Sequence, residues 1–184
     1  MEESQIIYEK NDTKILKTNS GNYNLTFSIE NKKMMMASIL NFDLIKLIYD
    51  LNQDICEKVN LEKYDETTAS ITVLLKNFGA DLGLPQKYSS LQITRIEKPS
   101  FIVFNLATVA LNNKPIWIND DLELADIKSI KIVCNTSLPH KTVINCLIDF
   151  QEDANAPAFL QKMTIMMVNK IINRLKQFIE NVAI

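Results

Sequence analysis

Residues 156–182 read APAFLQKMTIMMVNKIINRLKQFIENV, and their apolar side chains recur at the spacing of an α-helix. The apolar stripe consists of Leu160, Met163, Met167, Val168, Ile171, Ile172, Leu175, Ile179 and Val182. Pro157 falls in the first turn, where proline is favoured because the N–H that it lacks would have no partner there. Either Asp153 or Asn155 can cap the helix. At the usual rise per residue the helix is expected to be about 39 Å long, enough to cross a whole sheet.

The segment before this helix has the alternation of a β-hairpin. The apolar residues that share a face are Ile130, Ile132 and Cys134 on the first strand, and Ile144, Cys146, Ile148 and Phe150 on the second. Leu138-Pro139-His140 supplies the turn between them. The sequence therefore predicts a hairpin whose second strand leads toward the C-terminal helix.

The rest of the chain predicts more strands and one more helix. Tyr23, Leu25, Phe27 and Ile29 alternate with polar residues, which indicates a strand with one buried face. Other strands are expected at 5–8 and 14–17 (edge strands, because they carry charges), 34–40 (after a hairpin turn at 30–33), 70–76, 89–97, 100–108 (central, because it is apolar on both faces) and 116–118. A helical stripe over 42–59 comprises Leu44, Leu47, Ile48, Leu51, Ile55 and Val59, and Asn41 can cap it.

These elements define the expected fold class as α+β in a single domain, 1–184. We expect a largely antiparallel sheet of about seven to ten strands, with one helix near 42–59 and a long C-terminal helix, 156–182, packed on it. A chain of 184 residues with 47% hydrophobic residues has the size and the apolar content for one such core.

Composition limits the location and the partners of the protein. A net charge of −2 argues against a dedicated duplex-DNA binder, which usually has a basic excess. The acidic N-terminus has no signal-like apolar region, and no apolar run is long enough to cross a membrane. The odd number of cysteines, three, favours a reducing compartment. We therefore expect an intracellular protein (cytoplasmic, or in a viral factory or virion) that is not secreted.

The sequence contains no catalytic signature. Its one histidine, His140, has no recognisable nucleophile partner, and its three glycines are not clustered as in a phosphate-binding loop. We expect no enzymatic activity and no cofactor, and we interpret His140 as a solvated turn residue. The acidic residues Asp120, Asp121, Glu123 and Asp126 could bind a hard cation, but their spacing is not that of an EF-hand loop, and we interpret them as a solvated turn. Cys134 and Cys146 share a face of the hairpin but have too few further ligands for a metal site, and we interpret them, like Cys56, as small core residues.

Two groups of side chains are candidates for binding. Basic residues with a neighbouring aromatic could bind single-stranded nucleic acid, namely Lys76, Lys87, Tyr88, Arg95 and Lys98. Methionines and their neighbours on the C-terminal helix could line an apolar cavity or a subunit contact, namely Met163, Met167, Ile171 and Leu175.

The strand Cys146-Leu147-Ile148-Asp149-Phe150, followed by Ala156-Pro157-Ala158-Phe159-Leu160 and a helix to Val182, resembles the helix-grip fold of the START and Bet v 1 superfamily. The resemblance implies that the last strand runs into a helix that closes over a curved sheet and leaves an apolar cavity.

Three functions remain open. The first-ranked hypothesis is a non-catalytic structural or assembly protein that acts through protein contacts, as a homo-oligomer. Because 18 of its 20 basic residues are lysine and asparagine is abundant, we expect the source to be an A+T-rich genome, that of a large DNA virus, a protist or a bacterium, with the virus as the source considered for the assembly hypothesis. The alternatives are a module that binds a small apolar ligand in a helix-grip cavity, and a single-stranded nucleic-acid-binding protein.

Overall fold

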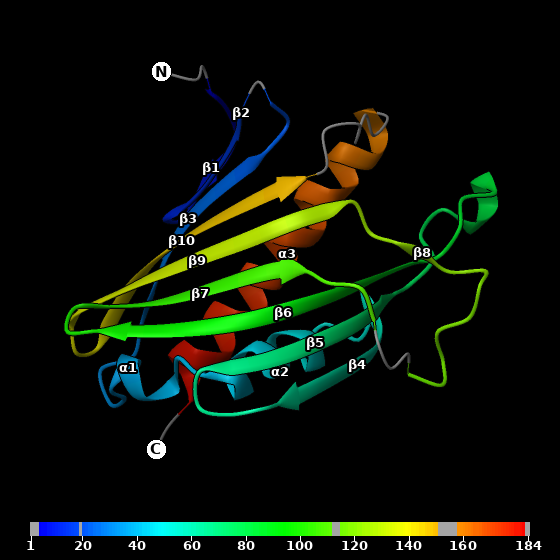
Figure 1. Ribbon diagram of the computed structural model, residues 1–184. Helices are drawn as coiled ribbons and strands as arrows, with labels where there is room; N and C mark the ends of the chain where they lie inside the picture. The colour runs from blue at the N-terminus through cyan, green and yellow to red at the C-terminus, as the bar shows by residue number, and fades with distance from the viewer. Residues whose placement is uncertain (1–3, 19, 112–114, 151–157, 183–184) are drawn as a thin grey trace.

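The computed structural model describes residues 4–18, 20–111, 115–150 and 158–182, and it contains one curved ten-stranded sheet with its helices on one face (Figure 1). The strands are β1 (Ser4–Lys10), β2 (Thr13–Thr18), β3 (Tyr23–Glu30), β4 (Cys56–Lys63), β5 (Thr68–Leu75), β6 (Lys87–Lys98), β7 (Phe101–Thr108), β8 (Glu123–Leu124), β9 (Ile127–Leu138) and β10 (Lys141–Phe150). The helices are α1 (Met36–Ile39), α2 (Phe42–Asp50) and α3 (Ala158–Asn181), with a 3-10 turn at Ala80–Leu82. The expected α+β class, the antiparallel sheet and the long C-terminal helix are confirmed.

The strand order is β1-β2-β3-β10-β9-β7-β6-β5-β4, and every neighbouring pair along it is antiparallel. The first three strands form a meander, and then α1 and α2 carry the chain across the sheet to β4 at the opposite edge. From β4 the chain returns strand by strand until β10 pairs with β3. This pairing joins strands more than a hundred residues apart, and it brings the N-terminal meander next to the strand that precedes α3.

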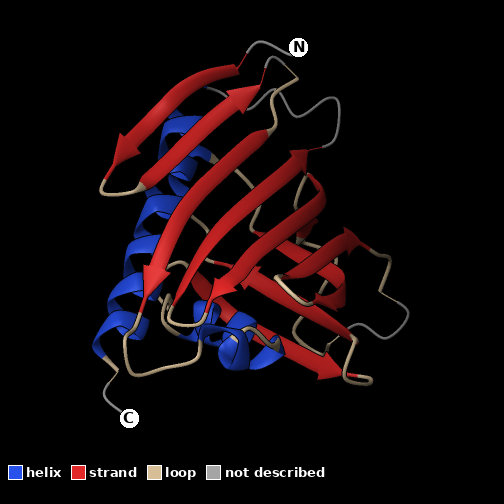
Figure 2. Cartoon of the chain, turned by 90° about the vertical axis from the view of Figure 1, so that its left-hand side faces the viewer, coloured by secondary structure: helices blue, strands red, loops and turns tan. Residues whose placement is uncertain are grey.

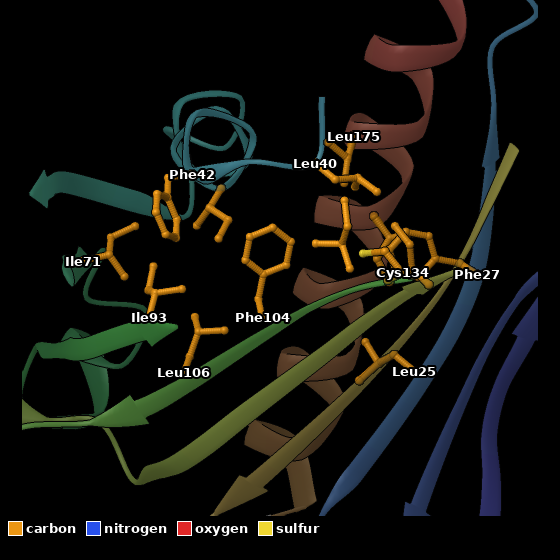
Figure 3. Close-up of a cluster of buried hydrophobic side chains, with 14 of the residues drawn as sticks. Leu25, Phe27, Leu40, Phe42, Ile71, Ile93, Phe104, Leu106, Cys134 and Leu175 are labelled. Atoms are coloured by element: carbon orange, nitrogen blue, oxygen red, sulfur yellow. The ribbon is translucent and has the colours of Figure 1, made fainter. Parts of the chain in front are cut away.

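The core fills the space between the sheet and the helices. Figure 2 shows α2 and α3 on the same side of the strongly twisted sheet. Alternate residues of the strands point to this side, such as Ile71, Ile93 and Phe104, all of which are buried. Phe104 on β7 packs edge-to-face on Phe42 of α2, with ring centroids 6.4 Å apart. The close-up in Figure 3 shows these side chains in the middle of one continuous apolar cluster.

The second helix is shorter than its sequence pattern predicts. Asn41 caps α2 as expected, with its side chain accepting hydrogen bonds from the backbone N–H groups of Asp43 and Leu44. The helix then ends at Asp50 and not near Val59. The carbonyl of Asn52 accepts from the N–H groups of both Ile55 and Cys56, which turns the chain into β4. The apolar residues at 55 and 59 thus belong to a turn and a strand whose spacing happens to match a helical stripe.

Three smaller predictions are also wrong. Residues 34–40 contain the short helix α1 and no strand, because β3 pairs with β10 and the N–H of Met36 bonds to the carbonyl of Pro139. Residues 116–118 form a turn, in which the N–H of Ile118 bonds to the carbonyl of Pro115. Strand β2 is not an edge strand, since it lies between β1 and β3. The predicted caps at Asp153 and Asn155, with Pro157, lie outside the described residues.

Hydrogen bonds of the Asn31 side chain connect the C-terminal end of α3 to the turn that follows β3. Its buried side-chain amide donates to the carbonyls of Ile179, at 2.6 Å, and Val182, at 3.0 Å. Its side-chain oxygen accepts from the N–H of Lys33 at 2.9 Å. The side chain therefore satisfies carbonyls that a helix C-terminus leaves without intrahelical partners.

We expect Asn31→Ala to lower the free energy of unfolding by about 1–3 kcal/mol, because it leaves buried carbonyls of α3 without donors. Asn181→Ala is the matched control, since this side chain is exposed and, among the described residues, its amide bonds to the carbonyl of Gln177 in its own helix. Urea unfolding of both variants measures the difference, and equal losses would contradict a specific role for Asn31.

Candidate functional site

The apolar gap between α3 and the N-terminal side of the sheet is the candidate site. Its lining comes from β2, β3, β10 and α3: Ile15, Tyr23, Leu25, Ile148, Phe150, Thr164, Ile165 and Val168. The space that remains between these side chains is about 20 Å³, which holds at most a single water molecule. The described structure thus has a closed apolar seam at this place.

The strand side of the seam follows from the register of the sheet. Ile15 of β2 pairs with Leu25 of β3, and Tyr23 of β3 pairs with Ile148 of β10. The Tyr23 and Phe150 rings meet edge-to-face, with centroids 5.7 Å apart. Burial raises the pKa of the Tyr23 hydroxyl above its usual value, in agreement with the apolar surroundings.

The two ends of α3 are held in different ways. In the N-terminal segment of the helix, residues 162–168, no side chain is fully buried. In the C-terminal segment, residues 170–181, Ile172, Leu175 and Ile179 are fully buried in the core. The apolar contacts between the helix and the sheet are therefore weaker at the end of the helix beside the seam.

Ion pairs and hydrogen bonds add to the hold on the C-terminal segment. Arg174 and Lys170 both form ion pairs with Asp54, in the turn after α2. Arg174 also donates to the side-chain oxygen of Asn52 at 3.0 Å and to the carbonyl of Leu51 at 3.4 Å. Hydrogen bonds from Arg174, and then from Lys170, hold the pKa of Asp54 well below its usual range. The carboxylate therefore keeps its charge, and the pairing, down to a pH below its normal titration.

The four α3 residues predicted to line a cavity or an interface lie partly in the core. Leu175 is 4% exposed and belongs to the core cluster, against which Met167 and Ile171 pack while half-buried. Met163 is also half-buried. The seam is lined instead by residues on the adjoining strip of the helix, Thr164, Ile165 and Val168. Val168 was part of the predicted stripe, whereas Ile165 lies off it, so the helical spacing alone did not point to it.

The predicted nucleic-acid residues are spread over both ends and both faces of β6. Lys87 begins this strand and pairs with Asp126 at 2.7 Å, whereas Lys98 ends it and lies over the Phe101 ring, which places the two lysines about 36 Å apart. Arg95 lies on the helix-covered face, where it donates to the carbonyl of Leu40 and pairs with Glu97. Lys76 and Tyr88 lie near Lys87, since Tyr88 pairs with Leu74 of β5. The structure therefore does not gather the five side chains into one surface.

The cysteines are free, as the odd count requires for at least one of them, and they lie in the interior. Cys56 and Cys134 are buried and Cys146 is half-buried. Burial raises the pKa of the thiol to about 11 for Cys56 and to about 12 for Cys134 and Cys146, so all three are protonated at neutral pH. Their expected role as small core residues agrees with this placement.

The remaining polar candidates lie at turns. His140 is exposed at the β9–β10 turn, where a ring nitrogen lies 2.9 Å from the carbonyl of Met34. The acids near β8 include Asp126, which is paired with Lys87. In the part of the chain that the structure describes, no group of three or more histidine, cysteine or acidic residues is placed to hold a metal ion. None of the helices formed by these residues combines the length and the hydropathy that a membrane crossing needs.

No protein-family model matches the sequence, and no curated protein is similar to it in sequence. Solved structures, however, share the fold over almost the whole chain. The human StarD13 (DLC2) lipid transfer and protein localization domain superposes with a TM-score of 0.73 at 9% identity, over 99% of this chain and 91% of that one. Human StAR-related lipid transfer protein 5 gives 0.70 at 10% identity, over 96% and 86%. A STAR-related lipid transfer protein fragment from Xanthomonas axonopodis gives 0.68 at 9% identity, over 96% and 98%.

These similarities correct the functional ranking drawn from the sequence. The first-ranked hypothesis, a structural or assembly protein that acts through protein contacts, is wrong, because solved structures that share the fold over almost the whole chain include those of lipid-transfer proteins. They favour the alternative of an apolar-ligand module. At this level of identity the similarity shows the fold alone, and the chain has the helix-grip fold of START domains.

Proposed function

We propose that this chain binds a small apolar molecule of the lipid class between α3 and strands β2, β3 and β10, and that it does so without catalysing a reaction. The observation that carries the proposal is the apolar seam, which lies where the last strand is followed by the helix that closes over the sheet. The lipid class is taken from the lipid-transfer proteins whose structures share this fold.

Binding requires the seam to open. A site for a small molecule usually has a volume of about 300–1,000 Å³, and the seam leaves about 20 Å³. The N-terminal segment of α3 is the part that can move away, because no described side chain of residues 162–168 is fully buried, whereas buried side chains and the ion pairs to Asp54 hold the C-terminal segment. An apolar ligand that buries about 200 Å² there would gain about 5 kcal/mol, which can offset the contacts that the helix gives up.

The proposal is tested by filling the seam from the helix side. Ile165→Trp places a large ring among the seam residues, and we expect it to weaken binding of a fluorescent long-chain fatty acid about tenfold or more. Met166→Trp is the matched control, since the adjacent Met166 side chain is 64% exposed and does not line the seam. Circular dichroism of both variants checks that the fold is retained.

Two results would contradict the proposal. The unmodified protein could show no saturable binding of fatty acid, sterol or phospholipid probes. Alternatively, the two tryptophan variants could weaken binding equally, which would place the probe on the surface and not in the seam.

A further inference from the structure

The hydroxyl group of Thr13, at the start of β2, is buried without a hydrogen-bond partner among the described residues. The side chain is 2% exposed, so solvent water does not take the place of that partner. Buried polar groups in folded proteins are almost always hydrogen-bonded, because a buried group without a partner gives up its hydration and gains nothing in return. The fold therefore keeps the Thr13 hydroxyl ready to bond with a ligand.

Thr13 lies just beyond the seam, on the face of the sheet that α3 covers. It is two residues before Ile15, which lines the seam, and the alternation of the strand turns both buried side chains to the same face. The pairing of Lys14 with Thr26 places Thr13 beside Phe27 of β3. Because two residues of a strand span about 7 Å, Thr13 is about 7 Å from the position of Ile15.

Contacts along α3 show which end of the seam Thr13 is near. The seam residues of β3 are opposite residues 164–168 of the helix. Asn31, just after the end of β3, donates to the carbonyl of Ile179 near the other end of the helix. Phe27 lies between these two levels on β3, and Thr13 lies beside Phe27. Thr13 is therefore at the inner end of the seam, next to the C-terminal segment of α3.

Two lysines lie near Thr13, one on the sheet and one on the helix. Lys10 of β1 pairs with Thr13 across the β1–β2 hairpin, so the two side chains share a face of the sheet. Lys176 of α3 donates to the carbonyl of Asn11, in the turn of the same hairpin, at 3.2 Å. Among the described residues neither lysine forms an ion pair, and Asp12, the acidic residue of this turn, is exposed. The inner end of the seam thus combines a hydroxyl group with two cations.

The rest of the seam favours a single hydrocarbon chain. Its lining consists mainly of apolar side chains, and the space between them is about 20 Å³. A single chain is the narrowest body that a lipid can have, so it needs the smallest movement of the N-terminal segment of α3. A chain that lies along the seam brings its inner end to Thr13.

We propose that the lipid bound in the seam is a long-chain fatty acid, with its carboxylate at Thr13, Lys10 and Lys176 and its hydrocarbon chain between α3 and the strands. This inference rests on the proposed function, because it names the ligand of the same seam. The carboxylate accepts a hydrogen bond from the Thr13 hydroxyl and is stabilised by the two ammonium groups. An alcohol of the same chain length gains the hydrogen bond alone.

The test compares dodecanoate with dodecanol, which has the same chain and no charge, by displacement of a fluorescent long-chain fatty acid at neutral pH. The affinity of the fluorescent probe is measured first for each variant. We expect the unmodified protein to bind dodecanoate about tenfold more tightly than dodecanol. Lys176→Met removes the charge and keeps the apolar stem of the side chain, so it should weaken dodecanoate about fivefold and leave dodecanol unchanged.

Thr13→Val tests the buried hydroxyl itself. The variant should weaken dodecanoate about tenfold, because a hydrogen bond to a charged group is lost. It should not lower the urea midpoint of the free protein, since the hydroxyl that it removes has no partner among the described residues. A lower midpoint would show that the hydroxyl already has a structural bond, and it would overturn the assignment.

Lys162→Met and Thr26→Val are the matched controls. Lys162 is exposed near the other end of α3, and Thr26 is on the outer face of β3, where its hydroxyl donates to the side chain of Asn145 at 2.9 Å. Neither variant should change the affinity for dodecanoate. A loss in Lys162→Met and none in Lys176→Met would place the carboxylate at the opposite end of the helix and overturn the inference.

The remaining outcomes separate this inference from the proposed function. Saturable binding of dodecanoate and dodecanol with equal affinity, unchanged by Lys176→Met and Thr13→Val, would leave the seam as a lipid site and overturn the carboxylate assignment alone. If neither compound, nor the fluorescent probe, binds the unmodified protein in a saturable way, the proposed function fails and this inference fails with it.

Discussion

Replacing Phe104 with alanine is expected to lower the free energy of unfolding by about 3–5 kcal/mol, the largest effect of any single change considered for this chain. Phe104 is 3% exposed on β7, a strand with neighbours on both sides. Its ring packs edge-to-face on Phe42 of α2. Figure 3 shows the ring between two halves of the core, one with Phe42, Ile71 and Ile93 and the other with Leu40, Cys134 and Leu175. Truncation removes the ring from both halves at once, and the long strands around it cannot collapse into the void.

Phe101→Ala is the matched control for this prediction, because it makes the same change three residues earlier on the same strand. Phe101 is only half-buried, and its ring is covered by the Lys98 side chain rather than by the core. We expect it to cost less than about 1.5 kcal/mol. Urea denaturation followed by circular dichroism gives both values. A loss below about 1 kcal/mol for Phe104→Ala would show that α2 and the sheet can close the gap, and that the core at this place is adaptable.

The elements that the sequence predicted correctly are those with long, unbroken periods. The apolar stripe of the C-terminal helix continues without a break over more than twenty positions of the chain. In the hairpin of β9 and β10, apolar and polar residues alternate on both sides of the turn that contains Pro139. If the helix were a strand, or the two strands were helices, part of their apolar side chains would face water. The resemblance to the helix-grip fold depended on these two elements, and the solved structures that share the fold confirm it.

The errors arose where a short apolar pattern fits two structures. Ile55 and Val59 continue the stripe of α2, but Asn52 ends the helix with hydrogen bonds that no spacing rule detects. Residues 34–40 look like a strand after a hairpin turn, and their partner position is taken by β10 instead. The turn at Asn52 lies within the apolar pattern itself, and the pairing of β3 with β10 joins distant parts of the chain, so apolar spacing alone could reveal neither.

The seam between α3 and the sheet was harder to predict than the fold, because it depends on which strands are neighbours. Alternation correctly placed Tyr23 and Leu25 on the buried face of one strand, and it placed Ile148 and Phe150, which are half-buried, on one face of another strand. It gave no sign that these faces are neighbours, since that depends on the pairing of β3 with β10. A binding site assembled from several elements is therefore visible only once the register is known.

The second large effect is expected in the hydrogen exchange of α3. Amide protons of the N-terminal segment, 162–168, should exchange about a hundredfold faster than those of residues 172–179 in the C-terminal segment. The C-terminal segment is held by three fully buried side chains and by the carboxylate of Asp54, whereas the N-terminal segment has no fully buried side chain. A hundredfold difference corresponds to about 3 kcal/mol of local opening, which is the opening that ligand entry to the seam requires.

The cause of this difference can be tested with one substitution. Asp54→Asn removes the ion pairs with Arg174 and Lys170, so the exchange of residues 172–179 should accelerate while that of 162–168 stays as it was. Asp50→Asn is the matched control, because within the described part of the chain Asp50 pairs with Lys46 on its own helix and has no ion pair with α3. Uniform exchange along α3 would mean that the helix opens as a whole or not at all. The seam would then have no separate route for a ligand, and the proposed lipid site would have to be sought elsewhere on the sheet. A gradient that Asp54→Asn flattens would instead show that this pairing gives the helix one fixed end and one that can release.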